Sequence, residues 1–361
     1  MKKLLFIIQT LQTGGGERVC VNLANYFAEH GYQISLAIHA RNIEGVYFLH
    51  PSIRIIHVRM LRFGYIPAAL AFLLQLFFMR RIPDVMIAFM WHANVFTSIL
   101  AKVSGIRCIL SEQSNPEMAK HDPNLIRLAS RHFRYADRMV VLNKGAFRFM
   151  CQKMGLPPER IVTIPNPCEK TVPCQTERLM EQPYLLAVGR LVSIKGFDRL
   201  IRMFAEIAEL HPEEHLVICG GGIERENLEK LVASLGLSDK IHFQGECRNL
   251  ASWYQYADAL CFTSHYEGWP NVIMEAMGQG LPVIAFNCHY GPAEMIASHR
   301  NGILVPQDDE ACYIREMTAY LDRLPESRAR YSAEAVRSIS AFTLEKICPR
   351  WEAIFEEETK R

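Results

Sequence analysis

Two signatures of metal chemistry are absent from this 361-residue chain. It has no Cys-x-x-Cys pair, and its eleven cysteines are scattered and odd in number. This pattern disfavours a zinc site or a disulfide framework and favours a reducing compartment. The chain also has no Asp-x-Asp, the usual carboxylate clamp for a metal–diphosphate complex. No metal cofactor is therefore expected.

Net charge is also scarce, at only +2, but it is unevenly distributed. Residues 1–170 hold 21 Lys and Arg against 10 Asp and Glu, a balance of +11, whereas residues 171–361 hold 19 against 28, a balance of −9. The basic front half predicts an anionic partner, which could be a membrane surface, a phosphorylated acceptor or nucleic acid. Nucleic acid is disfavoured because no aromatic interleaving or known motif accompanies the basic residues.

The chain pattern predicts two α/β domains. Apolar strand-like runs at 4–10, 33–40, 85–90, 106–113 and 138–143 alternate with helical segments, and the pattern restarts with runs at 184–190, 215–222, 240–245, 257–264 and 281–286. Such alternation is typical of doubly wound parallel sheets. We predict an N-terminal domain over 1–165, a proline-containing linker over 166–183, a C-terminal domain over 184–337 and a closing helix over 338–361.

The segment 60–83, MLRFGYIPAALAFLLQLFFMRRIP, has 17 uncharged, mostly apolar residues between Arg62 and Arg80. A membrane-spanning helix needs about 20 such residues, and Gly64, Pro67 and Gln75 shorten the effective run. Three interpretations stay open: a buried helix of the first domain, an interfacial helix over 62–81 that dips into a membrane, and a true span.

The glycine loop TGGGER (13–18) follows the first strand and opens a helix, where backbone amides can meet an anion. A nicotinamide dehydrogenase would have a third glycine where this chain has Val19, and an acidic residue after the second strand, which here ends in HARN (39–42). The dinucleotide interpretation fails on both counts. A plain tight turn remains the alternative to an anion site.

Two pairs of charged residues lie at predicted strand ends of the second half. Arg190 and Lys195 follow the strand at 184–190, and fixed cations can neutralise a departing diphosphate without a metal. In SHYEGWPNVIMEAM (264–277), Pro270 places a helix start near Pro270–Asn271. Glu267 is then in the preceding loop and Glu275 one turn inside the helix, so the two carboxylates can contact different parts of one ligand.

With these motifs, the chain resembles the retaining glycosyltransferases of family 4, which have the GT-B fold of two Rossmann-like domains facing each other across a cleft. The resemblance rests on E-G-x-x-x-x-x-x-E-A-M followed by G-x-P-V-I, on GRLVSIKGF (189–197), GGGIERENLEK (220–230) and the GGG loop, and covers essentially the whole chain. SEQSNPE (111–117) and IPNPCE (164–169) resemble the subgroup that extends undecaprenyl-diphosphate-linked sugars in bacterial glycan assembly.

The resemblance implies roles for individual residues. Arg190 and Lys195 would hold the diphosphate, Glu267 the hydroxyls of the donor sugar and Glu275 the ribose. It implies transfer with retention of anomeric configuration, by front-face attack assisted by the leaving phosphate. The candidate catalytic residues are Arg190, Lys195 and Glu267, and the candidate donor-binding residues are Gly15, Gly16, Gly268, Trp269, Pro270, Asn271, Glu275 and Glu294.

The loop SEQSN (111–115) departs from the family pattern. Relatives often carry a histidine here near the sugar, where this chain has Gln113, and a neutral glutamine cannot take a proton. Glu112 and Gln113 are retained as acceptor-binding candidates rather than as general bases. His92 is a further residue that could approach the site, although a structural role is the alternative.

The leading hypothesis is a peripheral membrane enzyme on the cytoplasmic face, which transfers a hexose or N-acetylhexosamine from a UDP-sugar to a lipid-linked glycan. The same chemistry on a soluble acceptor and a non-catalytic nucleotide-sugar-binding scaffold are the alternatives. The sequence does not select the sugar, and the preference for UDP over GDP comes from the family alone.

Overall fold

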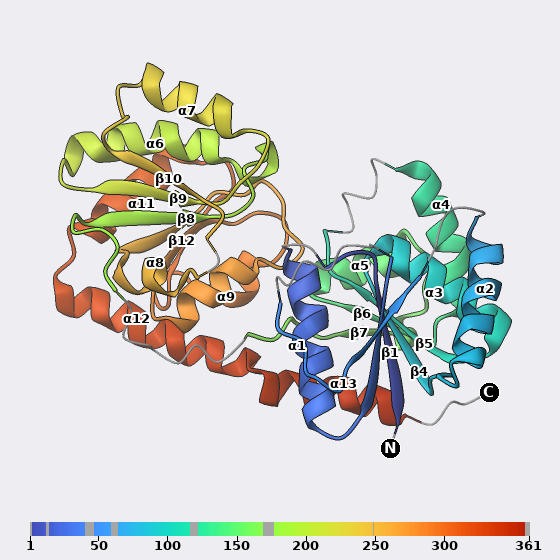
Figure 1. Ribbon diagram of the computed structural model, residues 1–361. Coiled ribbons are helices and arrows are strands. Elements are labelled where there is room, and N and C mark those ends of the chain that lie inside the picture. The colour runs from blue at the N-terminus through green and yellow to red at the C-terminus, as the bar shows by residue number, and fades with distance from the viewer. Residues whose placement is uncertain are drawn as a thin grey trace. The chain divides into compact units, whose positions relative to one another are not determined.

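The computed structural model describes residues 2–11, 14–39, 47–58, 64–115, 122–168, 177–247 and 249–357. The chain divides into two compact units (Figure 1). Unit 1 comprises Met1–Pro167 together with Leu344–Arg361, and unit 2 comprises Cys168–Thr343. The middle of the predicted linker over 166–183, residues 169–176, lies outside the described residues.

Unit 1 is built on a seven-stranded parallel sheet in the order β3-β2-β1-β4-β5-β6-β7. Its strands are β1 (Lys3–Ile8), β2 (Gln33–Ile38), β3 (Arg54–His57), β4 (Val85–Phe89), β5 (Arg107–Glu112), β6 (Arg138–Val141) and β7 (Ile161–Thr163). Every residue of β4 is buried, as expected for a central strand covered on both faces. The short edge strands β3 and β7 were not predicted.

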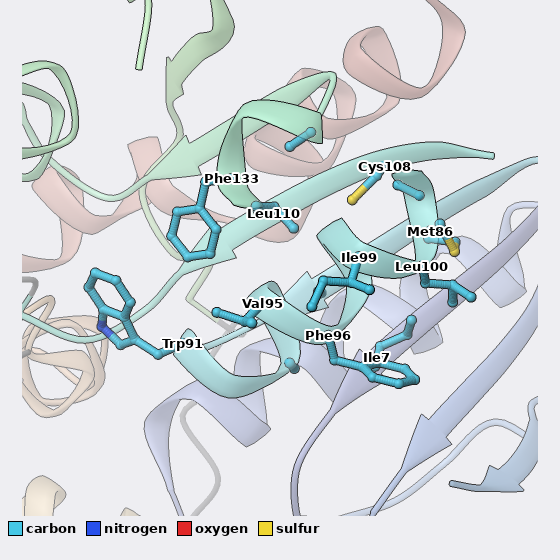
Figure 2. Packing of buried hydrophobic residues seen from close by; sticks show 14 of the residues in the cluster. Ile7, Met86, Trp91, Val95, Phe96, Ile99, Leu100, Cys108, Leu110 and Phe133 are labelled. Carbon is cyan, nitrogen blue, oxygen red and sulfur yellow. The ribbon is translucent and has the colours of Figure 1, made fainter. Parts of the chain in front are cut away.

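Helices cover both faces of this sheet. On one face lie α2 (Tyr65–Phe78), α3 (Trp91–Ser104), α4 (Pro123–His132) and α5 (Lys144–Gln152); on the other lie α1 (Gly15–Glu29) and α13 (Leu344–Glu356). Figure 2 shows the hydrophobic core on the face covered by α2, α3, α4 and α5. In it, Phe96 and Leu100 of α3 point toward the strand residues Ile7 and Met86. The C-terminal α13 belongs to unit 1, where its buried Trp351 and Phe355 pack against Phe89 and Phe27.

The apolar segment 60–83, for which three interpretations were open, contains α2, whose 14 residues extend over about 21 Å. One face of α2 is core, since Phe72 and Leu76 are 2% and 0% exposed. The opposite face is apolar and exposed. In the part of the chain that the structure describes, no helix combines the length and the apolar character needed to cross a membrane.

Unit 2 has a six-stranded parallel sheet in the order β10-β9-β8-β11-β12-β13. The strands are β8 (Tyr184–Val188), β9 (His215–Cys219), β10 (Ile241–Gly245), β11 (Ala259–Phe262), β12 (Val283–Phe286) and β13 (Ile303–Val305). The helices are α6 (Phe197–Leu210), α7 (Arg225–Ser234), α8 (Ala251–Tyr256), α9 (Asn271–Gly278), α10 (Pro292–Met295), α11 (Glu310–Leu321) and α12 (Pro325–Ile339). The prediction of two doubly wound parallel α/β domains is confirmed.

Candidate active site

The carboxyl ends of the strands in unit 2 bring together two of the predicted catalytic residues. Lys195 ends a short 3-10 turn (Ser193–Lys195) after β8, and Glu267 lies in the loop between β11 and α9. Lys195 Nζ donates to Glu267 Oε1 at 2.6 Å, although the two residues are 72 positions apart. The side chains are only 20% and 13% exposed, so this ion pair is largely shielded from water. Parallel strands place their ligands at this edge of the sheet.

Arg190, the third predicted catalytic residue, directly follows β8 and its loop glycine and is exposed. Its guanidinium forms no hydrogen bond or ion pair with another residue that the structure describes. It is therefore a cation available at the same edge of the sheet as Lys195, and the two can face an anion together.

The helix α9 begins at Asn271, as predicted, with Pro270 at the N-cap position. Gly291, which precedes α10, has φ +101°, and a Cβ added there would lie 2.3 Å from Pro270 Cδ. Only glycine therefore allows the loop after β12 to lie this close to the start of α9. The amide groups in the first turn of α9 carry a partial positive charge that suits a phosphate.

Glu275 is one turn inside α9, where Tyr254 donates from its hydroxyl to Glu275 Oε2 at 3.1 Å. Tyr254 comes from α8 and is only 4% exposed, so a buried hydroxyl group holds the Glu275 carboxylate. The prediction included Glu275 but missed Tyr254, because no local pattern links α8 to α9.

The other predicted donor-binding residues of this unit differ in their placement. The ring of Trp269 is buried, 5.8 Å from Phe342, and its Nε1 donates to Met274 Sδ at 3.2 Å, so this side chain packs within unit 2. Gly268 is buried in the loop beside it. Glu294 lies exposed on the four-residue α10.

In unit 1, the predicted glycine loop leads into α1. A Cβ at Gly16 would lie 3.3 Å from Met90 Sδ and 3.4 Å from Gln113 Cβ, so the start of α1 lies against the loop after β5. Glu17 turns back over this start, where it accepts from Thr10 Oγ1 at 3.0 Å and is 9% exposed. Its carboxylate satisfies part of the positive potential that an anion would otherwise use.

The predicted acceptor-binding residues behave differently from each other. Glu112 is 1% exposed and accepts from Ser114 Oγ at 2.6 Å, from the Ser114 amide at 3.0 Å and from Asn94 Nδ2 at 3.4 Å. Burial raises the pKa of Glu112 to about 7, against the opposing effect of these hydrogen bonds. Its contacts identify it as a residue that shapes the loop.

Gln113, next to the start of α1, instead has an amide oxygen without a hydrogen-bond partner among the described residues. Its Nε2 donates to Ser111 Oγ at 2.8 Å. Its Oε1 is shielded and has no partner among the residues described here. A buried amide oxygen without a partner is costly, and a ligand hydroxyl could satisfy it. His92 is held by Tyr65, with 3.3 Å between the hydroxyl and Nδ1.

The segment HPEEH (211–215) spaces two histidines four residues apart, but Pro212 disfavours the helix that zinc binding by this pair would need. His215 Nδ1 lies 2.9 Å from His242 Nε2 on the neighbouring strand, and burial lowers the pKa of both rings. Across the described ranges, no group of three or more His, Cys, Asp or Glu side chains could hold a metal ion.

Two family models match the chain on either side of residue 170. The glycosyl transferase 4-like domain matches residues 14–167, and the glycosyl transferases group 1 model matches residues 172–337. The chain belongs to the GT-B glycosyltransferases that combine these two domains.

The relatives of this glycosyltransferase include curated bacterial proteins. An uncharacterized glycosyltransferase of Haemophilus influenzae is 29% identical over 98% of this chain and 100% of its own length. An α-1,4-N-acetyl-D-galactosaminyltransferase of Campylobacter jejuni, whose name specifies a glycan on PP-undecaprenol, is 28% identical over 89% of each chain. Among solved structures, HepE of Anabaena in complex with UDP and glucose matches with a TM-score of 0.84 and 19% identity, over 98% of this chain and 99% of that one.

Proposed function

We propose that this glycosyltransferase moves a hexose or N-acetylhexosamine from a UDP-sugar to a lipid-linked glycan, with retention of configuration and without a metal. The observation that carries the proposal is the shielded Lys195–Glu267 pair at the carboxyl edge of unit 2, beside the start of α9. The UDP complex of HepE supports UDP as the nucleotide, and the Campylobacter relative, named for a glycan on PP-undecaprenol, supports a lipid-diphosphate acceptor.

Each charged residue has a distinct role in this proposal. Arg190 and Lys195 neutralise the diphosphate as the bond between the sugar C1 and the phosphate oxygen breaks, its electron pair passing to the phosphate. Glu267 accepts hydrogen bonds from sugar hydroxyls, and Glu275 accepts them from the ribose. The first turn of α9, with Gly268 and Asn271, receives phosphate oxygens. Gly15 and Gly16 of unit 1 and the exposed Glu294 of unit 2 are the remaining candidate donor-binding residues.

The acceptor attacks from the face that the phosphate leaves. Its oxygen forms the new bond to C1, and its proton passes to the departing phosphate oxygen, so no protein base is required. Gln113 fits this scheme because its unpartnered amide oxygen can accept a hydrogen bond but takes no proton. Glu112 supports it by fixing the loop through Ser114 and Asn94.

A membrane surface is the proposed location of the acceptor, on the cytoplasmic face. The outer face of α2 exposes Ile66, Leu70, Leu74, Phe77 and Phe78 by 57%, 48%, 58%, 60% and 80%. Spacings of three and four residues place these side chains on one stripe. Contiguous exposed apolar side chains of this kind mark interaction sites on soluble folds.

Basic residues accompany this stripe. α3 packs against both α2 and α4, so the three helices form one layer of unit 1 (Figure 1). Exposed cations lie near the ends of these helices: Arg80, Lys102, Arg131 and Arg134. An apolar stripe with exposed cations on the same layer of helices suits an interfacial helix on anionic lipid.

Two assays test the proposal. Purified protein is incubated with UDP-sugars and an undecaprenyl-diphosphate-linked glycan in excess EDTA, and the product is analysed for added sugar and its anomeric configuration. Transfer with retention supports the proposal. Transfer to a soluble glycan alone supports the alternative acceptor, and donor binding without any transfer supports a scaffold.

Flotation with phosphatidylglycerol-containing vesicles tests the membrane surface. Leu74→Asp and Phe78→Asp should abolish flotation, whereas Leu210→Asp, at a 65% exposed leucine of unit 2, should not. Equal flotation of all three variants contradicts the role of α2.

A further inference from the structure

Arg199 is a buried cation that the candidate site does not yet explain. It lies in the first turn of α6 and is only 5% exposed, between the core residues Phe197 and Leu200. A charged side chain at such a position is retained only when its donors are satisfied, because burial without partners is expensive.

The partners of Arg199 come from three neighbouring strand ends. Its Nε donates to the carbonyl oxygen of Thr263, just after β11, at 2.8 Å. Its Nη1 forms an ion pair with Asp308 Oδ1, beyond β13, at 2.7 Å. Its guanidinium carbon lies 4.2 Å from the ring centroid of Phe286, the last residue of β12. One side chain thus connects the ends of β11, β12 and β13 to α6.

The residues around Arg199 also connect the turn that carries Lys195 to the loop that carries Glu267. Thr263 donates from its hydroxyl to the Lys195 carbonyl oxygen at 3.2 Å, and the His265 amide donates to the Ile194 carbonyl oxygen at 2.8 Å. Gly196 has φ +64°, and a Cβ there would lie 2.3 Å from the Thr263 oxygen and 2.7 Å from Arg199 Nε. The turn of Lys195 and the loop of Glu267 therefore pack together directly on Arg199.

We propose that Arg199 is a positioning residue that fixes Lys195 relative to Glu267 for the transfer step. The inference rests on the proposed transfer reaction, and Arg199 acts through Thr263 rather than by touching the substrate. Its planar guanidinium serves the Thr263 carbonyl, the Asp308 carboxylate and the Phe286 ring at once, which the single ammonium group of a lysine cannot reproduce.

The first test compares Arg199→Lys with Arg202→Lys, an exposed arginine of the same helix. We expect Arg199→Lys to lower kcat by about 10- to 100-fold, since small misplacements of reacting groups have effects of this size. UDP affinity, measured by calorimetry, should fall much less. Arg202→Lys should match the wild type in both. A variant whose only change is a lower melting temperature, with unchanged kcat, overturns the inference.

A double-mutant cycle separates positioning from general stability. If Arg199 acts through Lys195, adding Arg199→Lys to Lys195→Ala should reduce kcat by only a small further factor. If the double variant instead loses kcat by the product of the two single-variant factors, the inference is contradicted. Should Arg199→Lys fail to fold, Asp308→Asn, at a 68% exposed side chain, replaces it in the same cycle.

The proposed function and this inference fail in different ways. A wild-type protein that neither binds UDP nor transfers sugar removes the proposed function. An active wild type with an equally active Arg199→Lys variant removes only the role of Arg199.

Discussion

Replacing Glu267 by glutamine should separate donor affinity from the rate of transfer. The substitution keeps the shape of the side chain but removes the charge that pairs with Lys195 at 2.6 Å. In the free protein this pair holds the lysine, so UDP must compete with Glu267 for it. Removing the carboxylate frees Lys195 for the diphosphate and also removes a negative charge beside it.

The size of the effect follows from the geometry. Two unit charges 2.6 Å apart attract by about 1.6 kcal/mol at the dielectric constant of water, and several-fold more in a partly shielded site. The cost of removing the two charged groups from water offsets most of this additional attraction. We therefore expect Glu267→Gln to strengthen UDP binding by about 1–2 kcal/mol, a factor of about 5–30.

Transfer should change in the opposite direction. Loss of one fixed electrostatic contact in a transition state typically lowers kcat by about 10²–10³-fold. UDP titration calorimetry measures the first quantity and a UDP-release assay the second. Glu206→Gln, at an exposed position of α6, is the control for net charge. Weaker UDP binding together with an unchanged kcat would refute the reasoning.

Three further predictions follow from the same structure. Lys195→Ala should lower transfer by about 10²–10³-fold, and a near-normal rate would remove Lys195 from the mechanism. Glu275→Ala should weaken UDP binding more than it slows the chemical step, which calorimetry and single-turnover kinetics distinguish. Burial raises the pKa of Glu214 from 4.5 to about 8, so its proton is retained on folding. Its contribution to stability is complete below about pH 4.5 and is lost at up to about 1.4 kcal/mol per pH unit as the pH rises toward 8. Glu214→Gln should remove this part of the decline in Tm between pH 5 and 8, whereas Glu209→Gln, at an exposed position of α6, should not; equal pH profiles would contradict the assignment.

The parallel α/β organisation could be predicted because central strands such as β4 are short and apolar throughout. The start of α9 was equally predictable, since Pro270 allows a helix to begin there but not to continue through it. The strands β3, β7 and β13 have only three or four residues and include positions that are not buried, so they do not form apolar runs like those of the other short strands. They are recognisable only by their pairing with a neighbour.

The site was predicted as a set of motifs rather than as contacts. Lys195 and Glu267 were assigned separate roles, and nothing local indicates that they pair across 72 residues. The ring of Trp269 lies inside the fold because tertiary packing, rather than the motif, determines its direction. The sequence contains one indication of the role of Arg199, a charged residue on the apolar face of an amphipathic helix. Its partners could not be predicted, because they follow strands that are distant in sequence.

Calorimetric titration with UDP and, separately, GDP in excess EDTA tests the central claim most directly. A diphosphate site formed by Arg190, Lys195 and the start of α9 predicts micromolar UDP binding without metal, which Lys195→Ala weakens. Tighter binding of GDP would contradict the UDP assignment. Binding of neither nucleotide would contradict the diphosphate site itself.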